Sequence, residues 1–312
     1  MGSYILIYMH VPTMKKVVSV DGERGAPDGR PIIRLDRAMI IDRVKSLLER
    51  CGTPDTVLPP TDLYNEGWML RLVLDWLHRN RHKNDSLCLP FPDGAEWYSE
   101  ALLPSAFFAT SRGDKLAESH THADGVIGDF SIGDNAKGDL ALRTGARYFV
   151  VVEAKMFSKL SPGVTNARYY NQAARNVACI AELVRRAGLR PDHFGTLGFF
   201  VVAPQSQIED GVFSKYMTRD SIMETVKRRV AEYGGKKKGW YDHWFVPVAK
   251  HATIETVSWE EIVSGISGLD APFGVELEAF YTNCLKFNRA ASNWNNPERE
   301  TVVLPDNGGS AG

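Results

Sequence analysis

Runs of apolar residues in the middle of the chain predict a β-sheet. Residues 148–154 are rich in β-branched and aromatic side chains, which is typical of a buried central strand. Residues 125–133 and 194–202 are predicted as further strands, and residues 253–257 as the last one. The sequence therefore predicts a sheet built around residues 148–154.

Apolar residues at helical spacing predict helices around this sheet. Helix 166–187 links two predicted strands into a βαβ unit, and such crossovers are nearly always right-handed. Ser258-Trp259-Glu260-Glu261 is a capping box that opens a short helix. The remaining helices are expected at residues 36–50, 63–79, 97–103, 221–233 and 274–288. This pattern predicts an α/β fold, a mixed sheet flanked by helices.

Length and composition describe an ordinary globular protein. The chain has 312 residues, of which 44% are hydrophobic and 24% charged, enough for one substantial core with additions at both ends. We expect an N-terminal strand and helix at residues 1–60, the core at 61–268, and a C-terminal helix with a disordered tail at 269–312. The net charge of −1 gives no global positive field, so any nucleic-acid binding must come from a local patch.

The cysteines and the apolar N-terminus exclude several classes of protein. Cys51, Cys88, Cys179 and Cys284 lie far apart and form no C-x-x-C pair, which argues against a zinc ribbon or an iron–sulfur cluster. The apolar segment at residues 4–11 is too short to span a bilayer. A cytoplasmic protein with no membrane partner is expected.

Residues 137–155 are expected to form a β-hairpin that brings acidic side chains together. The pair Thr144-Gly145 supplies the turn, and Asp139 lies on the first arm. Side chains alternate along a strand, so Glu153 and Lys155 share one face. If the loop keeps the arms in phase, the Cβ atoms of Asp139 and Glu153 lie roughly 7–8 Å apart, near enough for both carboxylates to bind one divalent ion. A one-residue shift would break this arrangement.

The pattern Asp139, thirteen residues, then Glu153-Ala154-Lys155 resembles the signature of the PD-(D/E)XK nuclease superfamily, with Gly138 in place of the proline. The resemblance covers about residues 62–205. It implies a restriction-endonuclease-like core that hydrolyses nucleic-acid phosphodiesters, DNA rather than RNA, in a defence, restriction or repair setting. Asp139 and Glu153 would bind Mg²⁺ or Mn²⁺. Lys155 would orient or activate the attacking water and neutralise the phosphate.

Two more polar residues gain a role from this resemblance. Glu66 faces the apolar side of the helix predicted at 63–79, and an acid that faces inward needs a partner. The resemblance implies that Glu66 assists the metal, and that Gln172 is the glutamine that some branches carry on the helix after the central strand. Without the resemblance, Glu66 would pair with a core arginine and Gln172 would be an ordinary polar helix residue.

The charge distribution favours a phosphate-binding surface near the hairpin. Residues 137–175 contain seven Lys and Arg but only two acids, Asp139 and Glu153. A lysine run beside Trp240 and Tyr241 could extend this surface or stack on an unpaired base, although such runs are usually solvated loops. The expected nucleic-acid contacts are Arg143, Arg147, Lys159, Arg168, Arg175, Lys236, Lys237 and Lys238.

A zinc hydrolase is the first alternative. His120-Thr121-His122-Ala123-Asp124 resembles the H-x-H-x-D metal motif of the metallo-β-lactamase superfamily, and two imidazoles with a carboxylate at this spacing can bind zinc. Gly125 replaces the histidine that is common next in that motif. The site would have to be completed by His193, His243 or His251.

The second alternative is a nuclease-like fold that binds nucleic acid or a partner without catalysis. The presence of Asp139, Glu153 and Lys155 argues against it. No Walker A sequence and no strand-linked G-x-G-x-x-G occurs, so ATP-driven activity is not expected. A homodimer stays open, because double-strand cutting would often call for two sites.

Overall fold

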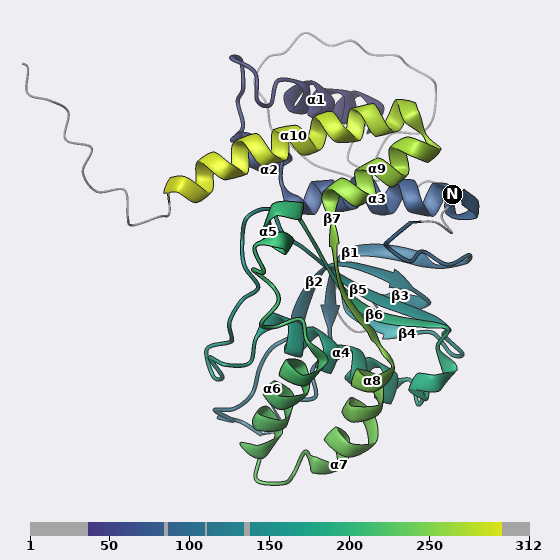
Figure 1. The fold of residues 1–312 in the computed structure, drawn as a ribbon, viewed down its shortest axis with the longest axis vertical. Coiled ribbons are helices and arrows are strands. Elements are labelled where there is room, and N and C mark those ends of the chain that lie inside the picture. Colours follow the sequence, from purple (N-terminus) through teal and green to yellow (C-terminus); the bar gives the residue numbers. More distant parts are fainter. Residues whose placement is uncertain (1–36, 84–86, 110, 134–137, 295–312) are drawn as a thin grey trace, which may run out of the picture. The chain divides into compact units, whose positions relative to one another are not determined.

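The computed structural model describes residues 37–83, 87–109, 111–133 and 138–294 (Figure 1). The chain divides into two compact units, Met1–Pro60 and Thr61–Gly312. In the first unit the predicted helix is present as α1 (Arg37–Glu49). The strand expected before it and the C-terminal tail after residue 294 lie outside the described residues.

The second unit is built on a five-stranded mixed sheet with the order β1-β2-β5-β6-β7. Its strands are β1 (Glu96–Leu103), β2 (Thr121–Gly128), β5 (Tyr148–Ala154), β6 (Thr196–Ala203) and β7 (Thr253–Ser258). β1, β2 and β5 pair antiparallel, whereas β5, β6 and β7 pair parallel. The predicted central strand β5 occupies the middle, and all its residues after Tyr148 are buried.

Helices cover both faces of this sheet (Figure 1). α3 (Glu66–Arg79) and α9 (Trp259–Leu269) pack on one face, and α10 (Ala271–Trp294) packs against both of them. α4 (Gln172–Arg186) packs on the other face, and α6 (Arg219–Ala231) and α8 (Val246–His251) pack against α4. Shorter elements are α2 (Pro60–Leu63), α5 (Gln205–Glu209), α7 (Lys238–Trp240), β3 (Phe130–Ile132), β4 (Leu140–Leu142), the 3-10 turns η1 (Arg81–Lys83) and η2 (Pro191–His193), and the π-helical turn η3 (Tyr241–Phe245). The expected α/β architecture is confirmed, and no described helix is long and apolar enough to cross a bilayer.

Local sequence explains where these helices begin. The side chain of Asn171 accepts a hydrogen bond from the backbone N–H of Ala174 and so caps α4. α9 opens with the predicted capping box, in which the side chains of Ser258 and Glu261 each bond to the other's backbone N–H. α4 follows β5 and precedes β6, so it forms the crossover of the predicted βαβ unit.

Residues 97–103 were expected to be helical, but they belong to β1. Ala101 and Leu103 enter the core of the sheet, and the segment pairs with β2 along its length. Trp97 and Tyr98 also suit a strand better than a helix. The expectation was wrong because tertiary pairing overrides the weak local preference of a short apolar segment.

The predicted hairpin does not form. β4 pairs with β3 in a separate two-stranded sheet, and Asp139 forms a bridge with Leu102 on the far side of β1. Strands β1 and β2 lie between Asp139 and Glu153. The two residues are therefore three interstrand spacings apart, a distance of roughly 14 Å. Asp129 causes the turn away from β5, because its carboxylate accepts the backbone N–H of Arg147 while its own N–H bonds to Tyr148.

Candidate active site

The adjacent strands β2 and β5 separate at Asp124. Their ladder ends at the pair Gly125 and Val152, so Asp124 is next in register with Glu153. The Asp124 Oδ2 atom accepts the backbone N–H of Ala154 at 2.8 Å. A side-chain carboxylate thus takes the place of a ladder hydrogen bond and lies beside Glu153.

The alternation of side chains is interrupted in β1 and β2, and this irregularity directs Asp124 toward the point where β2 and β5 separate. On β2, Ala123 and Val126 both enter the core under α4, although a regular strand would place them on opposite faces. Across the ladder, Glu100 has a φ of +59°, in the left-handed region. A Cβ atom on Gly125 would lie 2.9 Å from a Leu70 methyl carbon, so glycine lets α3 pack closely here.

Three side chains donate hydrogen bonds to the buried carboxylate of Glu153. Lys155 Nζ donates to Oε1 at 2.6 Å, and Gln172 Nε2 donates to the same oxygen. Asn176 Nδ2 donates to Oε2 at 3.4 Å from one turn further along α4. Gln172 also accepts the backbone N–H of Ser161, so it links the loop after β5 to the site. The structure therefore brings Glu153, Lys155 and Gln172 together.

Burial raises the pKa of Glu153 from its ordinary value of 4.5 to about 8. The negative charge of Asp124 acts in the same direction, whereas the Lys155 ammonium opposes it. Two adjacent carboxylates with one ammonium leave an excess of negative charge at the buried Glu153 and the half-buried Asp124. A proton or a cation would relieve that excess.

This pKa predicts how stability depends on pH in the absence of metal ions. Between pH 4.5 and about 8 the folded chain holds a proton on Glu153 that the unfolded chain has released. The contribution of this proton to stability is complete below pH 4.5 and is lost as the pH rises through about 8. In urea denaturation with a chelator, wild type should lose more stability than Glu153→Gln between pH 5 and 8.5. Equal losses in the two proteins would contradict the shifted pKa.

Asp139 lies apart from this pair, which corrects one member of the predicted ligand set, whereas the role of Glu66 at the metal stays a prediction. Asp139 faces His120, with 3.8 Å between its Oδ1 atom and the histidine Nε2 atom. Glu66 lies at the start of α3 near Cys284 of α10, where burial and the charge of Glu66 raise the pKa of the thiol. Among the described residues, no three His, Cys, Asp or Glu side chains form a group that could hold a metal ion.

The predicted basic contacts fall into separate places. Arg143 and Arg147 precede β5, at the opposite end of the strand from Glu153, because their loop turns back toward β3. Lys159 and Arg168 are exposed on the loop that follows the site. The remaining predicted contacts are Arg175, half-buried on α4, and Lys236, Lys237 and Lys238 after α6.

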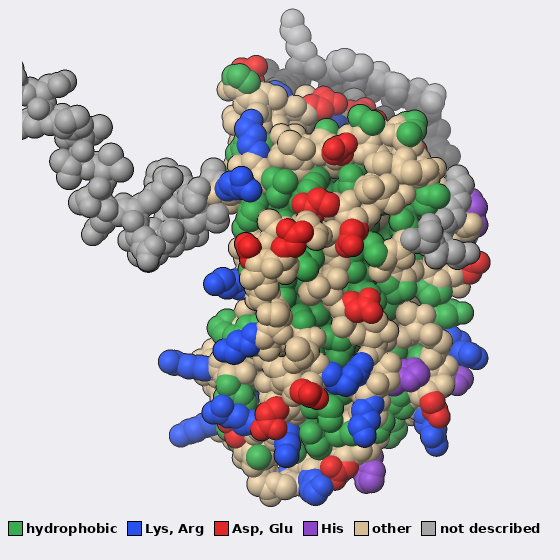
Figure 2. All heavy atoms as spheres, viewed as in Figure 1, with side chains coloured by type: hydrophobic (Ala, Val, Ile, Leu, Met, Phe, Trp, Pro, Cys, Tyr) green, Lys and Arg blue, Asp and Glu red, His purple; other side chains and the backbone are tan. Residues whose placement is uncertain are grey.

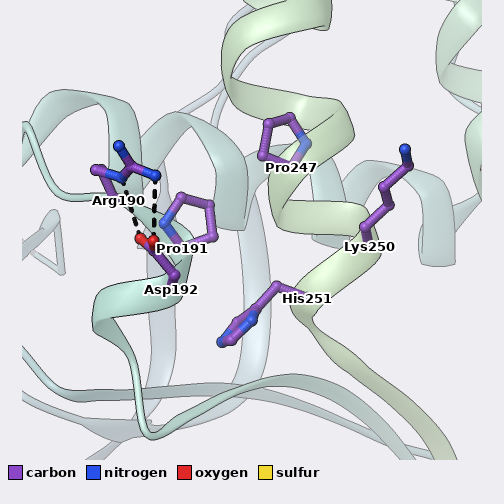
Figure 3. A pocket seen from close by; sticks show the side chains of 6 residues that line it. All are labelled: Arg190, Pro191, Asp192, Pro247, Lys250 and His251. Atoms are coloured by element: carbon purple, nitrogen blue, oxygen red, sulfur yellow. Dashed lines mark hydrogen bonds and ion pairs between the residues drawn. The ribbon is translucent and has the colours of Figure 1, made fainter.

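The histidines of the zinc alternative are also dispersed. The His120 ring packs on Phe108, and His122 is exposed. His251 Nε2 lies 3.2 Å from the carbonyl oxygen of Phe194, at the start of the parallel strands, whereas Glu153 lies at the end of β5. His251 lines a surface hollow of about 340 Å³. Figure 3 shows its side chain across from the ion pair of Arg190 and Asp192.

Two residues of this site were not predicted for it: Asp124, which was considered only as a zinc ligand, and Asn176. Asp124 stands immediately before the segment predicted as the first strand, which in fact begins at Thr121. Asn176 lies four residues after Gln172 and thus on the same side of a helix, so that spacing could have identified it. Asn176 is fully buried.

Asp124 and Glu153 are chemically suited to a hard divalent cation. Mg²⁺ is usually held by one or two carboxylates together with water, so a third acidic ligand is not required. The excess of negative charge at this pair supports the same assignment.

No family model matches the chain, and comparison with curated proteins and with solved structures also finds no match. What the chain itself defines is an α/β protein with a five-stranded mixed sheet and a pair of adjacent carboxylates, half-buried Asp124 and buried Glu153, where two strands separate.

Proposed function

We propose that the protein is a metal-dependent nuclease with a restriction-endonuclease-like core of the PD-(D/E)XK type, in which Asp124 takes the role first given to Asp139. One observation carries the proposal. Asp124 lies in register with Glu153 where β2 and β5 separate, and Lys155 follows two residues later on the same face as Glu153. The mixed sheet with helices on both faces agrees with such a core.

Asp124 and Glu153 would hold Mg²⁺ or Mn²⁺, which supplies Lewis-acid stabilisation of the phosphate and a water molecule of lowered pKa. Gln172 and Asn176 orient the Glu153 carboxylate through their amide groups. Lys155 places a positive charge 2.6 Å from Glu153, where it can neutralise a phosphate oxygen and orient the attacking water. DNA is proposed ahead of RNA, in a defence, restriction or repair setting.

Purified protein should cleave at least one of four substrates, single- or double-stranded DNA or RNA, when Mg²⁺ or Mn²⁺ is present. A chelator should abolish cleavage, because the paired carboxylates then lack their cation. Gel analysis of end-labelled substrates measures both effects. Cleavage that persists in the chelator would refute the proposed chemistry, and absence of cleavage with every substrate and metal would refute the nuclease.

A further inference from the structure

The loop of residues 157–171 leads from the candidate site to a contact with helix α6, and both segments carry positive charge. The loop runs between Lys155 and Gln172, both of which contact Glu153. Residues 155–171 and 211–240 together contain eleven Lys and Arg and three acids, although the whole chain has a net charge of −1. Figure 2 shows Lys and Arg side chains gathered at the lower left, over α6. Positive charge is therefore concentrated on the loop that leaves the site and on α6, which contacts this loop through Tyr169.

Tyr169 and Arg228 join the loop to α6. The guanidinium carbon of Arg228 lies 3.7 Å from the centroid of the Tyr169 ring, much closer than the roughly 6 Å limit for a cation–π contact. Tyr169 is half-buried and Arg228 is exposed. The ring thus holds the guanidinium while Arg228 stays exposed to solvent, where a planar cation can stack on a nucleic-acid base.

The loop that connects the site to this pair also carries cations for a phosphate backbone. Lys159 and Arg168 are exposed on the same loop, which contains no acidic residue. Among the described residues, none of the observed ion pairs involves Lys159, Arg168 or Arg228. Their charges are available to phosphates, and each neutralised phosphate releases counterions.

We propose that the substrate reaches the site as a single strand of nucleic acid, with one unpaired base stacked on Arg228 and its phosphates beside Lys159 and Arg168. The inference rests on the proposed nuclease function and adds the class of substrate. A duplex turns the faces of its bases inward, so only an unpaired base offers a face to the Arg228 guanidinium. Aromatic and Arg planes next to a cationic track are typical of single-strand binding.

Fluorescence anisotropy in a chelator tests the inference without cleavage. The full-length Glu153→Gln protein is titrated with labelled single-stranded DNA, single-stranded RNA and duplex DNA. Both single strands should bind more tightly than the duplex, and comparing them identifies the preferred sugar. The substitution Arg228→Lys, added to Glu153→Gln, keeps the positive charge but removes the planar guanidinium. It should weaken single-strand binding roughly 5- to 100-fold and leave duplex binding and the salt dependence of binding unchanged.

Two further variants separate stacking from charge. Arg168→Gln should lower the slope of log affinity against log salt by about one for every nucleic acid. The matched control is Arg190→Gln, which removes an exposed charge before β6, at the other end of the sheet from Glu153, and should change nothing. The inference would be overturned if the protein bound duplex as tightly as single strands, or if Arg228→Lys kept its full affinity for single strands. In either case, metal-dependent cleavage would still support the nuclease. Single-strand binding without any cleavage would support the surface and refute the nuclease.

Discussion

Asp124→Asn should lower the rate of phosphodiester cleavage by about 10³-fold. Loss of this carboxylate removes half of the proposed cation site, and Lewis-acid stabilisation is worth several kcal/mol of barrier. The asparagine amide oxygen can still accept the backbone N–H of Ala154, so the fold should be retained. Single-turnover kinetics at saturating enzyme measure the loss, and thermal unfolding confirms that the variant is folded.

Asp139→Asn is the matched control, because it makes the same chemical change at the acid that the sequence first suggested. Asp139 lies beyond β1, where it faces His120, so cleavage should stay within a few-fold of wild type. If Asp139→Asn loses activity as severely as Asp124→Asn, the assignment of the two acids is wrong.

Lys155→Met should lower the rate by about 10²- to 10⁴-fold, the range typical of a positioned acid–base group. The Lys155 side chain is only 11% exposed, and methionine fills most of its volume, so the variant should still fold. Loss of the ammonium removes the interaction that opposes burial at Glu153, and the pKa of Glu153 should rise further. The same single-turnover assay measures the rate.

Lys159→Met is the control for the lysine prediction. Lys159 is an exposed cation four residues later, outside the contacts of Glu153. Its loss should weaken substrate binding and leave the rate at saturating enzyme close to wild type. A Lys155→Met protein that cleaves within a few-fold of wild type would remove Lys155 from the mechanism.

Local patterns allowed much of this fold to be predicted. The central strand β5, the crossover helix α4 and the capping box at Ser258 were all visible, because each depends on residues close in sequence. The shared face of Glu153 and Lys155 followed from the two-residue period of a strand. Their contact with Gln172 was expected only from the resemblance, because residues 155–171 separate β5 from α4.

Partners that are distant in sequence could not be predicted in the same way. Asp139 was placed beside Glu153 by assuming that adjacent segments pair, but a turn held by Asp129 sends β4 to β3 instead. Asp124 was considered only as a zinc ligand, because its position opposite Glu153 depends on a pairing of segments about thirty residues apart. One backbone register therefore decides which acid joins the site.

Titration of the purified protein with Mn²⁺, followed by electron paramagnetic resonance of the free ion, tests the central claim most directly. If Asp124 and Glu153 form one cation site, wild type and Asp139→Asn should bind Mn²⁺ alike, and Asp124→Asn should bind at least 10-fold more weakly, as for a lost charged ligand worth over about 1.4 kcal/mol. Unchanged Mn²⁺ affinity in Asp124→Asn, with loss of binding in Asp139→Asn, would contradict the site described here.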